Sequence, residues 1–459
     1  MLKALRLSEV AGPLSARLVG EDCAFDAVST DSRSIVPGQL FIALSGPRFD
    51  GHDYLAQVSA KGAVAALVER EVADVGLPQL VVGNAALALG QLAALNRQAY
   101  GGPLAAVTGS SGKTTVKEML AAILRAAFME LGGTVLATRG NLNNQLGVPL
   151  TLLELAPEHK GAVIELGASG IGEIAYTVGL TKPHVAIITN AGSAHVGEFG
   201  GPENIVLAKG EILEGLSDGG VAVLNRDDMA FERWVQRAAG RRVLSFALRD
   251  ACADFHANEL SRDPRGCPAF TLYCHDGQAR IQLNLLGEHS VANALAAAAA
   301  AYALSVPLVA IKNGLESLLP VKGRAVAQLA RNGARVIDDT YNANPASICA
   351  AIDILTGFSG RKVLVLGDIG ELGAWSEQGH RQVGEYAIGK VDAFYAVGPQ
   401  MKHAVQAYGS EGRHFADQAA LIDAVRAESG DSTILIKGSR SAAMENVVVA
   451  LCGDCGESH

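Results

Sequence analysis

From Leu104 onward, short apolar segments alternate with longer amphipathic segments. The apolar segments end near Gly, Asn or Thr, and they are LAAVT, TVLAT, GAVIELG, HVAIITN and VAVLN. Continuous apolar strands joined by crossover helices are typical of a parallel sheet that is buried on both faces. Ligands of such sheets bind at the carboxyl ends of the strands. The pattern therefore predicts an α/β domain with its site at that edge.

Changes in this pattern divide the chain into three predicted domains. Residues 1–101 mix short apolar runs with turn clusters and end in a helical stretch before a Gly-Gly-Pro break. Residues 102–319 form the central domain, in which the segment 251–286 is expected to add antiparallel strands. In residues 320–459 the alternation resumes with ARVIDDT, KVLVLGD, DAFYAVG and STILIKG, which predicts a second doubly wound sheet.

Composition and charge narrow the function. The chain has 459 residues, of which 49% are hydrophobic and 19% charged, as in ordinary globular α/β proteins. Its net charge is -9 and it has no basic run, which disfavours nucleic-acid binding and favours a small-molecule substrate. The first residues lack the apolar core of a secretory signal, and the Ala-rich stretch 294–303 is too short to span a bilayer. We therefore expect a cytoplasmic protein that is not bound to a membrane.

The cysteines do not indicate a disulfide framework. There are seven, an odd number scattered along the chain, so reduced thiols are expected. Cys452 and Cys455 form a single CxxC without a second pair or His partners. We interpret this pair as part of a frayed tail rather than as a zinc or redox site.

A glycine-rich loop follows the first strand of the central domain. Its residues, Gly109, Ser110, Ser111, Gly112, Lys113, Thr114 and Thr115, lead into the amphipathic helix VKEMLAAILRAAF. Glycines allow close backbone approach, and a helix N-terminus presents unpaired N–H groups to phosphate. Lys113 would pair with the β- and γ-phosphates, and the Thr114 hydroxyl would bind Mg²⁺. The strict spacing GxxxxGK[ST] is not met, because Val107 stands where it requires Gly. The sequence nevertheless predicts a nucleotide site.

Other residues at the same sheet edge could complete the site. Glu165 ends the strand GAVIELG and offers oxygen to a cation, or is a strand-end carboxylate that faces solvent. His195 follows the strand HVAIITN and is a ligand or a turn histidine. Lys209 lies in AKGEI, and its helical context alone favours a solvated lysine.

Over nearly its whole length the chain resembles the Mur ligases. The matching segments are STDSRSIVPGQLFIALSGPRFDGHDY, TGSSGKTTVKEM, GNLNNQLGVPLTLL, ELGASGIGEI, NAGSAHVGEFG, AKGEI, GEHSVANALAAAA, KGR, DDTYNANP, GDIGELG and KGSRSAAMENVV. Two of them, GNLNNQLGVPLTLL and DDTYNANP, resemble the branch that adds D-alanyl-D-alanine. Ile369 stands where that branch commonly has Met, a change that keeps an apolar side chain.

The resemblance implies a fold and a reaction. The fold would have an N-terminal domain for the UDP-sugar, a central P-loop-type ATPase domain and a C-terminal Rossmann-like domain. The reaction would use ATP to phosphorylate the terminal carboxylate of UDP-N-acetylmuramoyl-tripeptide, and the amine of D-alanyl-D-alanine would attack the acyl phosphate. The third residue of the tripeptide could be meso-diaminopimelate or L-lysine. We expect the chain to act as a monomer.

The resemblance also implies roles for residues. Lys113, His195 and Lys209 would be catalytic, and Thr114, Glu165, His195 and a carbamylated Lys209 would bind two Mg²⁺ ions. Asn293 would contact adenine, whereas Arg324, Asp339, Asn342 and Asn344 would contact phosphate and ribose or lie near the γ-phosphate. Turns or helix caps are the alternative for those last four residues. The residues implied for substrate binding are Thr30, Asp31, Ser32, Arg33, Arg48, Asp50, Gly51, His52, Asn143 and Asn144.

Two other functions compete with this hypothesis. A folylpolyglutamate synthase-type or cyanophycin-type ligase would share the phosphate loop but should lack the segments DSR and GNLNNQLGVP. A P-loop switch or motor ATPase should have the strict P-loop, which is missing here.

Overall fold

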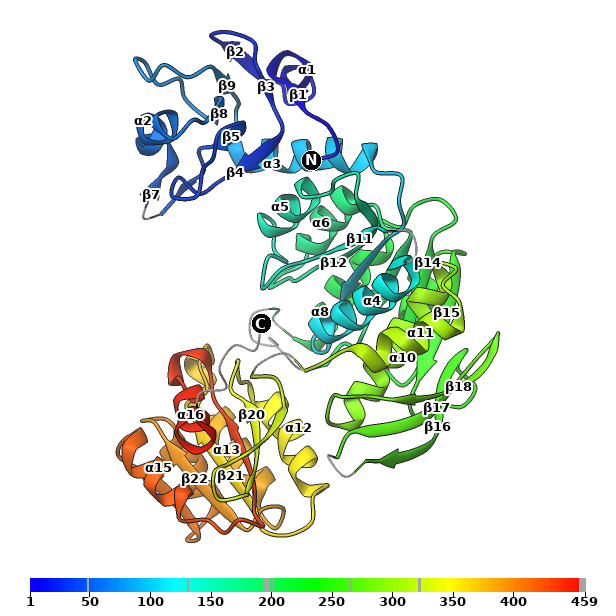
Figure 1. Ribbon diagram of the computed structural model, residues 1–459, viewed down its shortest axis with the longest axis vertical. Coiled ribbons are helices and arrows are strands. Elements are labelled where there is room, and N and C mark those ends of the chain that lie inside the picture. Colours follow the sequence, from blue (N-terminus) through cyan, green and yellow to red (C-terminus); the bar gives the residue numbers. More distant parts are fainter. Residues whose placement is uncertain are drawn as a thin grey trace. The chain divides into compact units, whose positions relative to one another are not determined.

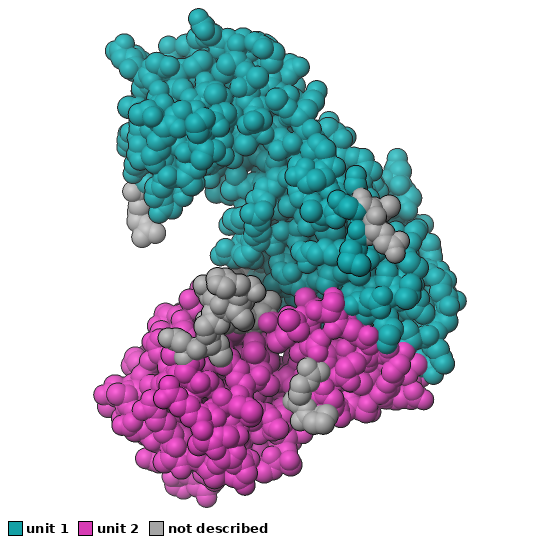
Figure 2. Space-filling model, in the orientation of Figure 1, with its two compact units in different colours: residues 1–257, 272–279, 292–315 teal, residues 258–271, 280–291, 316–459 magenta. Residues whose placement is uncertain are grey.

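The computed structural model describes residues 1–47, 49–129, 132–192, 199, 201–263, 266–320 and 323–453. The chain divides into two compact units (Figure 2). Unit 1 comprises Met1–Ala257, Leu272–Ala279 and Ala292–Leu315, and unit 2 comprises Asn258–Thr271, Arg280–Val291 and Glu316–His459. No helix in the described part of the chain is long and apolar enough to cross a bilayer.

The N-terminal part of unit 1 is built on a five-stranded sheet with the order β2-β9-β8-β5-β4. Its strands are β2 (Arg17–Val19), β4 (Ala27–Ser29), β5 (Gln39–Ile42), β8 (Ala65–Val68) and β9 (Gln79–Val81). Only β2 runs antiparallel to its neighbour in this sheet. The helices are α1 (Leu7–Ala11), α2 (Leu55–Ala60) and α3 (Ala85–Ala99), and the short pairs are β1 (Leu5–Arg6) with β3 (Ala24–Phe25) and β6 (Ser45–Gly46) with β7 (Phe49–Asp50).

A nine-stranded sheet follows, with the order β11-β12-β10-β13-β14-β15-β16-β17-β18 (Figure 1). Its strands are β10 (Leu104–Thr108), β11 (Thr134–Ala137), β12 (His159–Glu165), β13 (Val185–Ile188), β14 (Val221–Asn225), β15 (Arg242–Ala247), β16 (Phe255–Arg262), β17 (Pro268–Cys274) and β18 (Gly277–Gln282). All pairs from β11 to β16 are parallel. The carboxyl ends of β10, β12 and β13 therefore lie side by side.

Helices connect and cover these strands. They are α4 (Lys113–Phe128), α5 (Gly147–Leu153), α6 (Glu173–Thr181), α8 (Pro202–Gly210), the 3-10 turn η3 (Glu211–Leu213), α9 (Phe231–Arg237), α10 (Glu288–Ala303) and α11 (Leu308–Ser317). Strands β10 and β13 are wholly buried and β12 is buried from Gly161 to Glu165, as expected for a parallel sheet with helices on both faces.

Helix α3 joins the N-terminal sheet to the central sheet within unit 1. Leu89 and Leu92 belong to the same apolar core as Leu152 of α5. The buried Asn96 side chain donates to the carbonyl oxygens of Leu152 (2.9 Å) and Leu155 (3.1 Å). On the next residue, Arg97 donates to two carbonyl oxygens at the end of α6, those of Thr181 (2.7 Å) and Lys182 (2.8 Å).

Unit 2 contains a six-stranded sheet with the order β19-β20-β24-β21-β22-β23. Its strands are β19 (Val326–Leu329), β20 (Arg335–Asp339), β21 (Lys362–Gly367), β22 (Ala393–Val397), β23 (Gly412–Phe415) and β24 (Thr433–Lys437). The helical elements are α12 (Pro345–Thr356), η4 (Gly373–Trp375), α13 (Ser376–Ala387), α14 (Met401–Tyr408), α15 (Gln418–Arg426), η5 (Arg440–Ala442) and α16 (Glu445–Cys452). Only β19 is antiparallel to its neighbour.

This second sheet is doubly wound. Alternate residues of β21 contribute to different cores: Leu364 and Leu366 pack with α12, α13 and α14, whereas Val363 and Val365 pack with α15 and α16. The alternation follows from the strand period of two residues. The predicted doubly wound arrangement is confirmed.

We predict that Asn96→Leu destabilises unit 1. The substitution removes the side-chain amide that donates to the carbonyl oxygens of Leu152 and Leu155, which should lower the free energy of unfolding by about 1–3 kcal/mol. Urea unfolding followed by the fluorescence of the buried Trp234 in unit 1 measures the change. Gln98→Leu on the exposed side of the same helix is the matched control, and an equal loss in both variants would contradict the prediction.

Candidate active site

Two glycines allow the phosphate loop to pass close to neighbouring side chains. Gly109 has a φ of +145° and Gly112 a φ of +79°, values that favour glycine. A β-carbon on Gly109 would overlap Thr189 Oγ1, and one on Gly112 would overlap Asn293 Oδ1. The loop therefore requires glycine at both positions. Asn293, for which we expected a nucleotide contact, lies directly beside it.

The segment after β13 holds the phosphate loop in place. The Ser111 backbone N–H donates to Asn190 Oδ1 (3.1 Å), and the Ser110 N–H donates to the Asn190 carbonyl oxygen (3.0 Å). Thr189 Oγ1 donates to the Ser111 carbonyl oxygen (2.6 Å). Thr189 and Asn190 were not predicted as supporting residues, although they end the recognised strand HVAIITN.

Lys113 is the first residue of α4 and folds back over the loop. Its ammonium group donates to the carbonyl oxygens of Gly109 (2.7 Å) and Ser110 (3.3 Å). Thr114 and Thr115 stand in the first turn of the helix, where backbone N–H groups lack intrahelical acceptors. The arrangement presents a cation and several N–H donors at one point, as phosphate binding requires.

Glu165 is buried at the carboxyl end of β12, so the alternative of a strand-end carboxylate that faces solvent is wrong. Only 2% of the residue is exposed. Its Oε1 accepts from Asn143 Nδ2 (2.9 Å), whereas its buried Oε2 has no hydrogen-bond partner among the described residues. A buried carboxylate oxygen without a partner is costly. Glu165 therefore fits a ligand for a hard cation.

Lys209 is buried in the last turn of α8, which corrects the expectation of a solvated helix lysine. It is 3% exposed, and its Nζ lies 5.1 Å from the centroid of the Phe199 ring. Burial and, to a smaller degree, the charge of Lys113 lower the pKa of Lys209 to about 7, against the opposing effect of Glu173 and Glu211. Near neutral pH much of this amine is therefore uncharged.

Two carboxylates that raise the pKa of Lys209, those of Glu211 and Glu173, accept from backbone N–H groups at and before the start of α6. Glu211 is buried, and its carboxylate accepts from the backbone N–H groups of Gly172 (2.7 Å) and Ala175 (2.9 Å). Glu173 accepts from the Ser169 N–H (3.0 Å). Neither carboxylate was predicted as part of the site. Their engagement with backbone groups is consistent with an indirect role beside Lys209.

Several predicted site residues form contacts within unit 2. Lys437 is buried; its Nζ donates to Asp339 Oδ2 (2.6 Å) and to the Asn342 carbonyl oxygen (2.9 Å). The Arg324 guanidinium lies 4.3 Å from the centroid of the Tyr341 ring. Asn344 caps α12 by accepting from the Ser347 N–H (2.8 Å), as the alternative of a helix cap predicted. Lys437, in the recognised segment KGSR, had been given no role.

In the N-terminal part, local contacts occupy the predicted substrate residues. In the loop after β4, which also contains Thr30 and Ser32, the exposed Arg33 pairs with Asp31 (2.8 Å) and holds the pKa of that carboxyl at about 2. Asp50 accepts from the buried His52 ring (2.6 Å) and from Arg70 (2.8 Å).

Other predicted residues are either occupied by local bonds or lie outside the described ranges. Gly51 follows Asp50 directly and is buried. Asn144 Oδ1 accepts from the backbone N–H of Gly147, the first residue of α5 (2.8 Å). Arg48, His195 and Cys455 lie outside the described residues.

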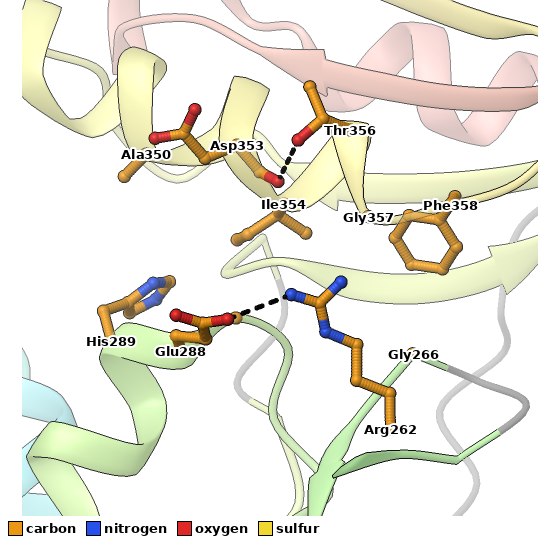
Figure 3. A pocket seen from close by; sticks show the side chains of 11 residues that line it. Arg262, Gly266, Glu288, His289, Ala350, Asp353, Ile354, Thr356, Gly357 and Phe358 are labelled. Atoms are coloured by element: carbon orange, nitrogen blue, oxygen red, sulfur yellow. Dashed lines mark hydrogen bonds and ion pairs between the residues drawn. The ribbon is translucent and has the colours of Figure 1, made fainter. Parts of the chain in front are cut away.

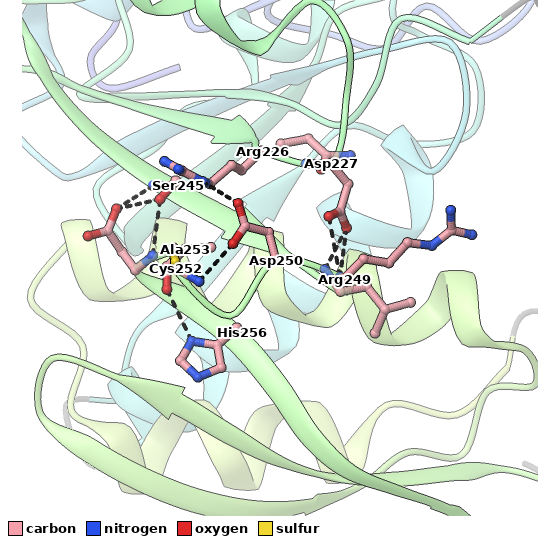
Figure 4. Close-up of polar contacts among 11 residues, drawn as sticks. Arg226, Asp227, Ser245, Arg249, Asp250, Cys252, Ala253 and His256 are labelled. Carbon is pink, nitrogen blue, oxygen red and sulfur yellow. Dashed lines mark hydrogen bonds and ion pairs between the residues drawn. The ribbon is translucent and has the colours of Figure 1, made fainter.

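A polar cluster and a cavity lie outside the predicted site. In the turns after β14 and β15, Arg226 pairs with Asp250 (2.6 Å), and Asp227 accepts from the backbone N–H of Leu248 (2.6 Å) (Figure 4). These charged side chains therefore stabilise the two turns. In unit 2 a cavity of about 470 Å³ lies beside α12, and its wall includes Arg262 paired with Glu288 at 3.3 Å (Figure 3). Its lining includes none of the predicted site residues.

Together, the fold and the site define a class: a nucleotide-binding α/β protein with a phosphate loop after its first central strand. Family models match three successive ranges, described as Mur ligase family, catalytic domain (24–97), Mur ligase middle domain (107–301), and Mur ligase, glutamate ligase domain (324–440). The chain belongs to the Mur ligase family.

Individual relatives are similar over nearly their whole lengths. The UDP-N-acetylmuramoyl-tripeptide--D-alanyl-D-alanine ligase of Escherichia coli (strain K12) is 47% identical over 450 residues, which cover 97% of this chain and 98% of that protein. The structure of MurF from Acinetobacter baumannii has a TM-score of 0.89 at 39% identity and covers 98% of both chains. MurF ligase from Thermotoga maritima, solved in complex with ADP, has a TM-score of 0.81 at 28% identity, covering 92% of this chain and 96% of that one. The expected three-domain α/β fold is confirmed.

We predict that the Lys209 amine makes stability depend on pH. Because its folded-state pKa is about 7 and its ordinary value is 10.5, the unfolded chain binds more protons between these values. The destabilisation is complete below about pH 7 and disappears as the pH approaches 10.5. In CO2-free buffer the melting temperature of the wild type should therefore rise with pH relative to that of Lys209→Met. A constant difference across this range would contradict the lowered pKa.

Proposed function

We propose that this protein is an ATP-dependent ligase that joins D-alanyl-D-alanine to UDP-N-acetylmuramoyl-tripeptide during synthesis of the peptidoglycan precursor. The observation that carries the proposal is 47% identity, over 97% of the chain, to the Escherichia coli enzyme named for this reaction. A Haemophilus influenzae enzyme of the same name is 40% identical over 96% of the chain. The phosphate loop and the buried Glu165 supply the polar groups that such a reaction needs.

The reaction proceeds in two substitutions. A carboxylate oxygen of the tripeptide attacks the γ-phosphorus of ATP, and ADP leaves. The amine of D-alanyl-D-alanine then attacks the acyl carbon, forms the amide after losing a proton, and displaces inorganic phosphate. Lys113 and the N–H groups at the start of α4 bind and orient the transferred phosphoryl group. Catalysis by these residues is chiefly positioning and charge neutralisation.

Mg²⁺ would supply further neutralisation of the phosphate oxygens. Within the described residues, His, Cys, Asp and Glu side chains form no cluster of three or more that could hold a metal ion. The site would therefore combine Glu165 with the Thr114 hydroxyl and a carbamylated Lys209, and His195 would serve a second ion. Burial keeps the Lys209 amine partly neutral, which is the form that reacts with CO2, and the carbamate formed is an anion suited to magnesium.

The substrates would be divided among three domains, 1–101, 102–319 and 320–459. Each of the three matched family ranges falls inside one of these domains, which supports the division. Residues 30–33, Arg48 and 50–52 would bind the UDP-sugar end, Asn143 and Asn144 the peptide, and Asn293 the adenine. Arg324, Asp339, Asn342 and Asn344 would contact ribose and phosphate. The cytoplasmic location and the monomeric state stay predictions.

Phosphate release tests the ligase directly. With ATP and Mg²⁺, the purified protein should release phosphate only when UDP-N-acetylmuramoyl-tripeptide and D-alanyl-D-alanine are both present. One amide product should form for each phosphate. Lys113→Ala should lower the rate by about 100-fold or more, because the transferring group loses a charged contact. Release that is independent of both substrates would contradict the proposal and would favour a switch ATPase, whereas ligation of glutamate would favour a folylpolyglutamate synthase-type ligase.

The carbamate on Lys209 has its own test. Lys209→Ala should lose activity by about 10- to 100-fold, and a short carboxylic acid should restore part of it by replacing the missing carboxylate. Incubation of the wild type with ¹³C-labelled bicarbonate should give a carbamate carbon signal that Lys209→Ala lacks. Full activity in the variant, with no effect of the acid, would refute the role of the carbamate.

A further inference from the structure

Helix α4 contains a lysine besides Lys113 that is buried and has none of the roles proposed above. Lys117 lies one helical turn after Lys113, and only 2% of it is exposed. Its Nζ donates to the carbonyl oxygen of Thr138 (2.6 Å) and forms an ion pair with Glu118 (2.8 Å). Burial of an ammonium group is costly unless it is paired. Thr138 is therefore the residue through which Lys117 could affect the site.

Thr138 connects α4 to the strand that ends in Glu165. It directly follows β11 and is buried. Its Oγ1 accepts from the Glu165 backbone N–H (2.9 Å), and its own N–H donates to the carbonyl oxygen of Val163 (3.1 Å). Lys117 and Glu165 thus contact the same residue, one through its carbonyl group and the other through its hydroxyl group.

The segment that begins at Thr138 returns to Glu165 five residues later. Asn143 Nδ2 donates to Glu165 Oε1 (2.9 Å), and the Asn143 carbonyl oxygen accepts from the Gly167 N–H (2.8 Å). Both ends of the segment are therefore bonded to the end of β12. Only the side-chain oxygen Glu165 Oε2 is left without a partner among the described residues. Anything that moves Thr138 should also change how this oxygen is aimed.

We propose that Lys117 is a positioning residue for Glu165. Its charge-assisted bond holds Thr138, and Thr138 with Asn143 holds the Glu165 carboxylate in the orientation that leaves Oε2 available to a divalent cation. The inference rests on the proposed role of Glu165 as a magnesium ligand. It assigns Lys117 no contact with substrate or nucleotide.

The position of the charge favours this role over simple packing. Replacement of a buried ion pair by apolar side chains is often neutral or stabilising, so stability alone does not require a lysine here. A charge-assisted hydrogen bond is shorter and stronger than a neutral one, and it restricts its acceptor more tightly. Groups that orient a metal ligand from behind have large effects on metal affinity.

The experiment measures binding rather than turnover. ADP is titrated calorimetrically into the full-length protein at a series of Mg²⁺ concentrations and in EDTA. In Lys117→Met the Mg²⁺ concentration that gives the half-maximal gain in ADP affinity should rise about tenfold. The ADP affinity in EDTA should stay unchanged, because the phosphate loop itself is intact. A purely structural role would not separate these two measurements.

Two further variants serve as comparisons. Thr138→Val keeps the carbonyl acceptor of Lys117 but removes the hydroxyl that accepts from Glu165, so it should show the same shift. Arg97→Met removes another buried cation that donates to backbone carbonyls, here those of Thr181 and Lys182, without any bond to Glu165. It should lower the melting temperature and leave the Mg²⁺ dependence unchanged.

The outcomes separate this inference from the proposed function. A wild type whose ADP affinity ignores Mg²⁺ would remove the metal site, and the inference with it. A wild type that depends on Mg²⁺, together with a shift of less than about twofold in Lys117→Met, would overturn the role of Lys117 alone. An equal shift in Arg97→Met would also overturn it. If Lys117→Met does not fold, Thr138→Val decides by the same criterion.

Discussion

Charge held away from water at the carboxyl edge of the central sheet is the constraint on which the rest of the site depends. The Lys117 ammonium group bonds to the Thr138 carbonyl oxygen and pairs with Glu118. One oxygen of the Glu165 carboxylate, Oε1, accepts from Asn143. The other oxygen, Oε2, has no hydrogen-bond partner among the described residues. Burial, and after it the charge of Lys113, lowers the pKa of Lys209. The groups without a full set of polar partners, Glu165 Oε2 and the Lys209 amine, are therefore those that a bound cation or a modification of the amine would stabilise most.

The second sheet meets the same constraint with the same type of residue. Lys437, at the end of β24, is buried and donates to Asp339, at the end of the neighbouring strand β20, and to the Asn342 carbonyl oxygen. Lys117 on α4 and Lys437 at the end of β24 thus each bond to a residue at the carboxyl end of another strand, Thr138 after β11 and Asp339 in β20. A long, flexible side chain with three donors suits this task, since it can reach backbone acceptors that a shorter cation could not.

Local pattern was enough to predict strands β10 to β14 of the central sheet and β20, β21, β22 and β24 of the second sheet, because they are apolar runs between helices. It missed β15 (Arg242–Ala247), and the segment 251–286 was expected to be antiparallel although its first strand, β16, pairs in parallel with β15. The strand β23, with the sequence GRHF, was missed since an edge strand needs few apolar residues. Among the site residues, the phosphate loop has a local motif and was found from it. Lys209 was expected in solvent from its helix alone, because its burial depends on contacts outside that helix, such as the one with the Phe199 ring. Lys117 was not singled out for the same reason: its acceptor, Thr138, is 21 residues distant.

The contact of α3 with the central domain limits which residues can vary there among related sequences. Asn96 and Arg97 donate to main-chain carbonyl oxygens of α5, of the turn after it and of the end of α6. Every amino acid carries such a carbonyl group, so the receiving surface can change its side chains without loss of these acceptors. Asn96 and Arg97 thus supply the polar part of the junction, and Leu89 and Leu92 supply an apolar part that does depend on the side chains of α5. N-terminal domains from relatives should therefore be interchangeable only where they bring both this Asn-Arg pair and apolar residues that fit the surface around Leu152.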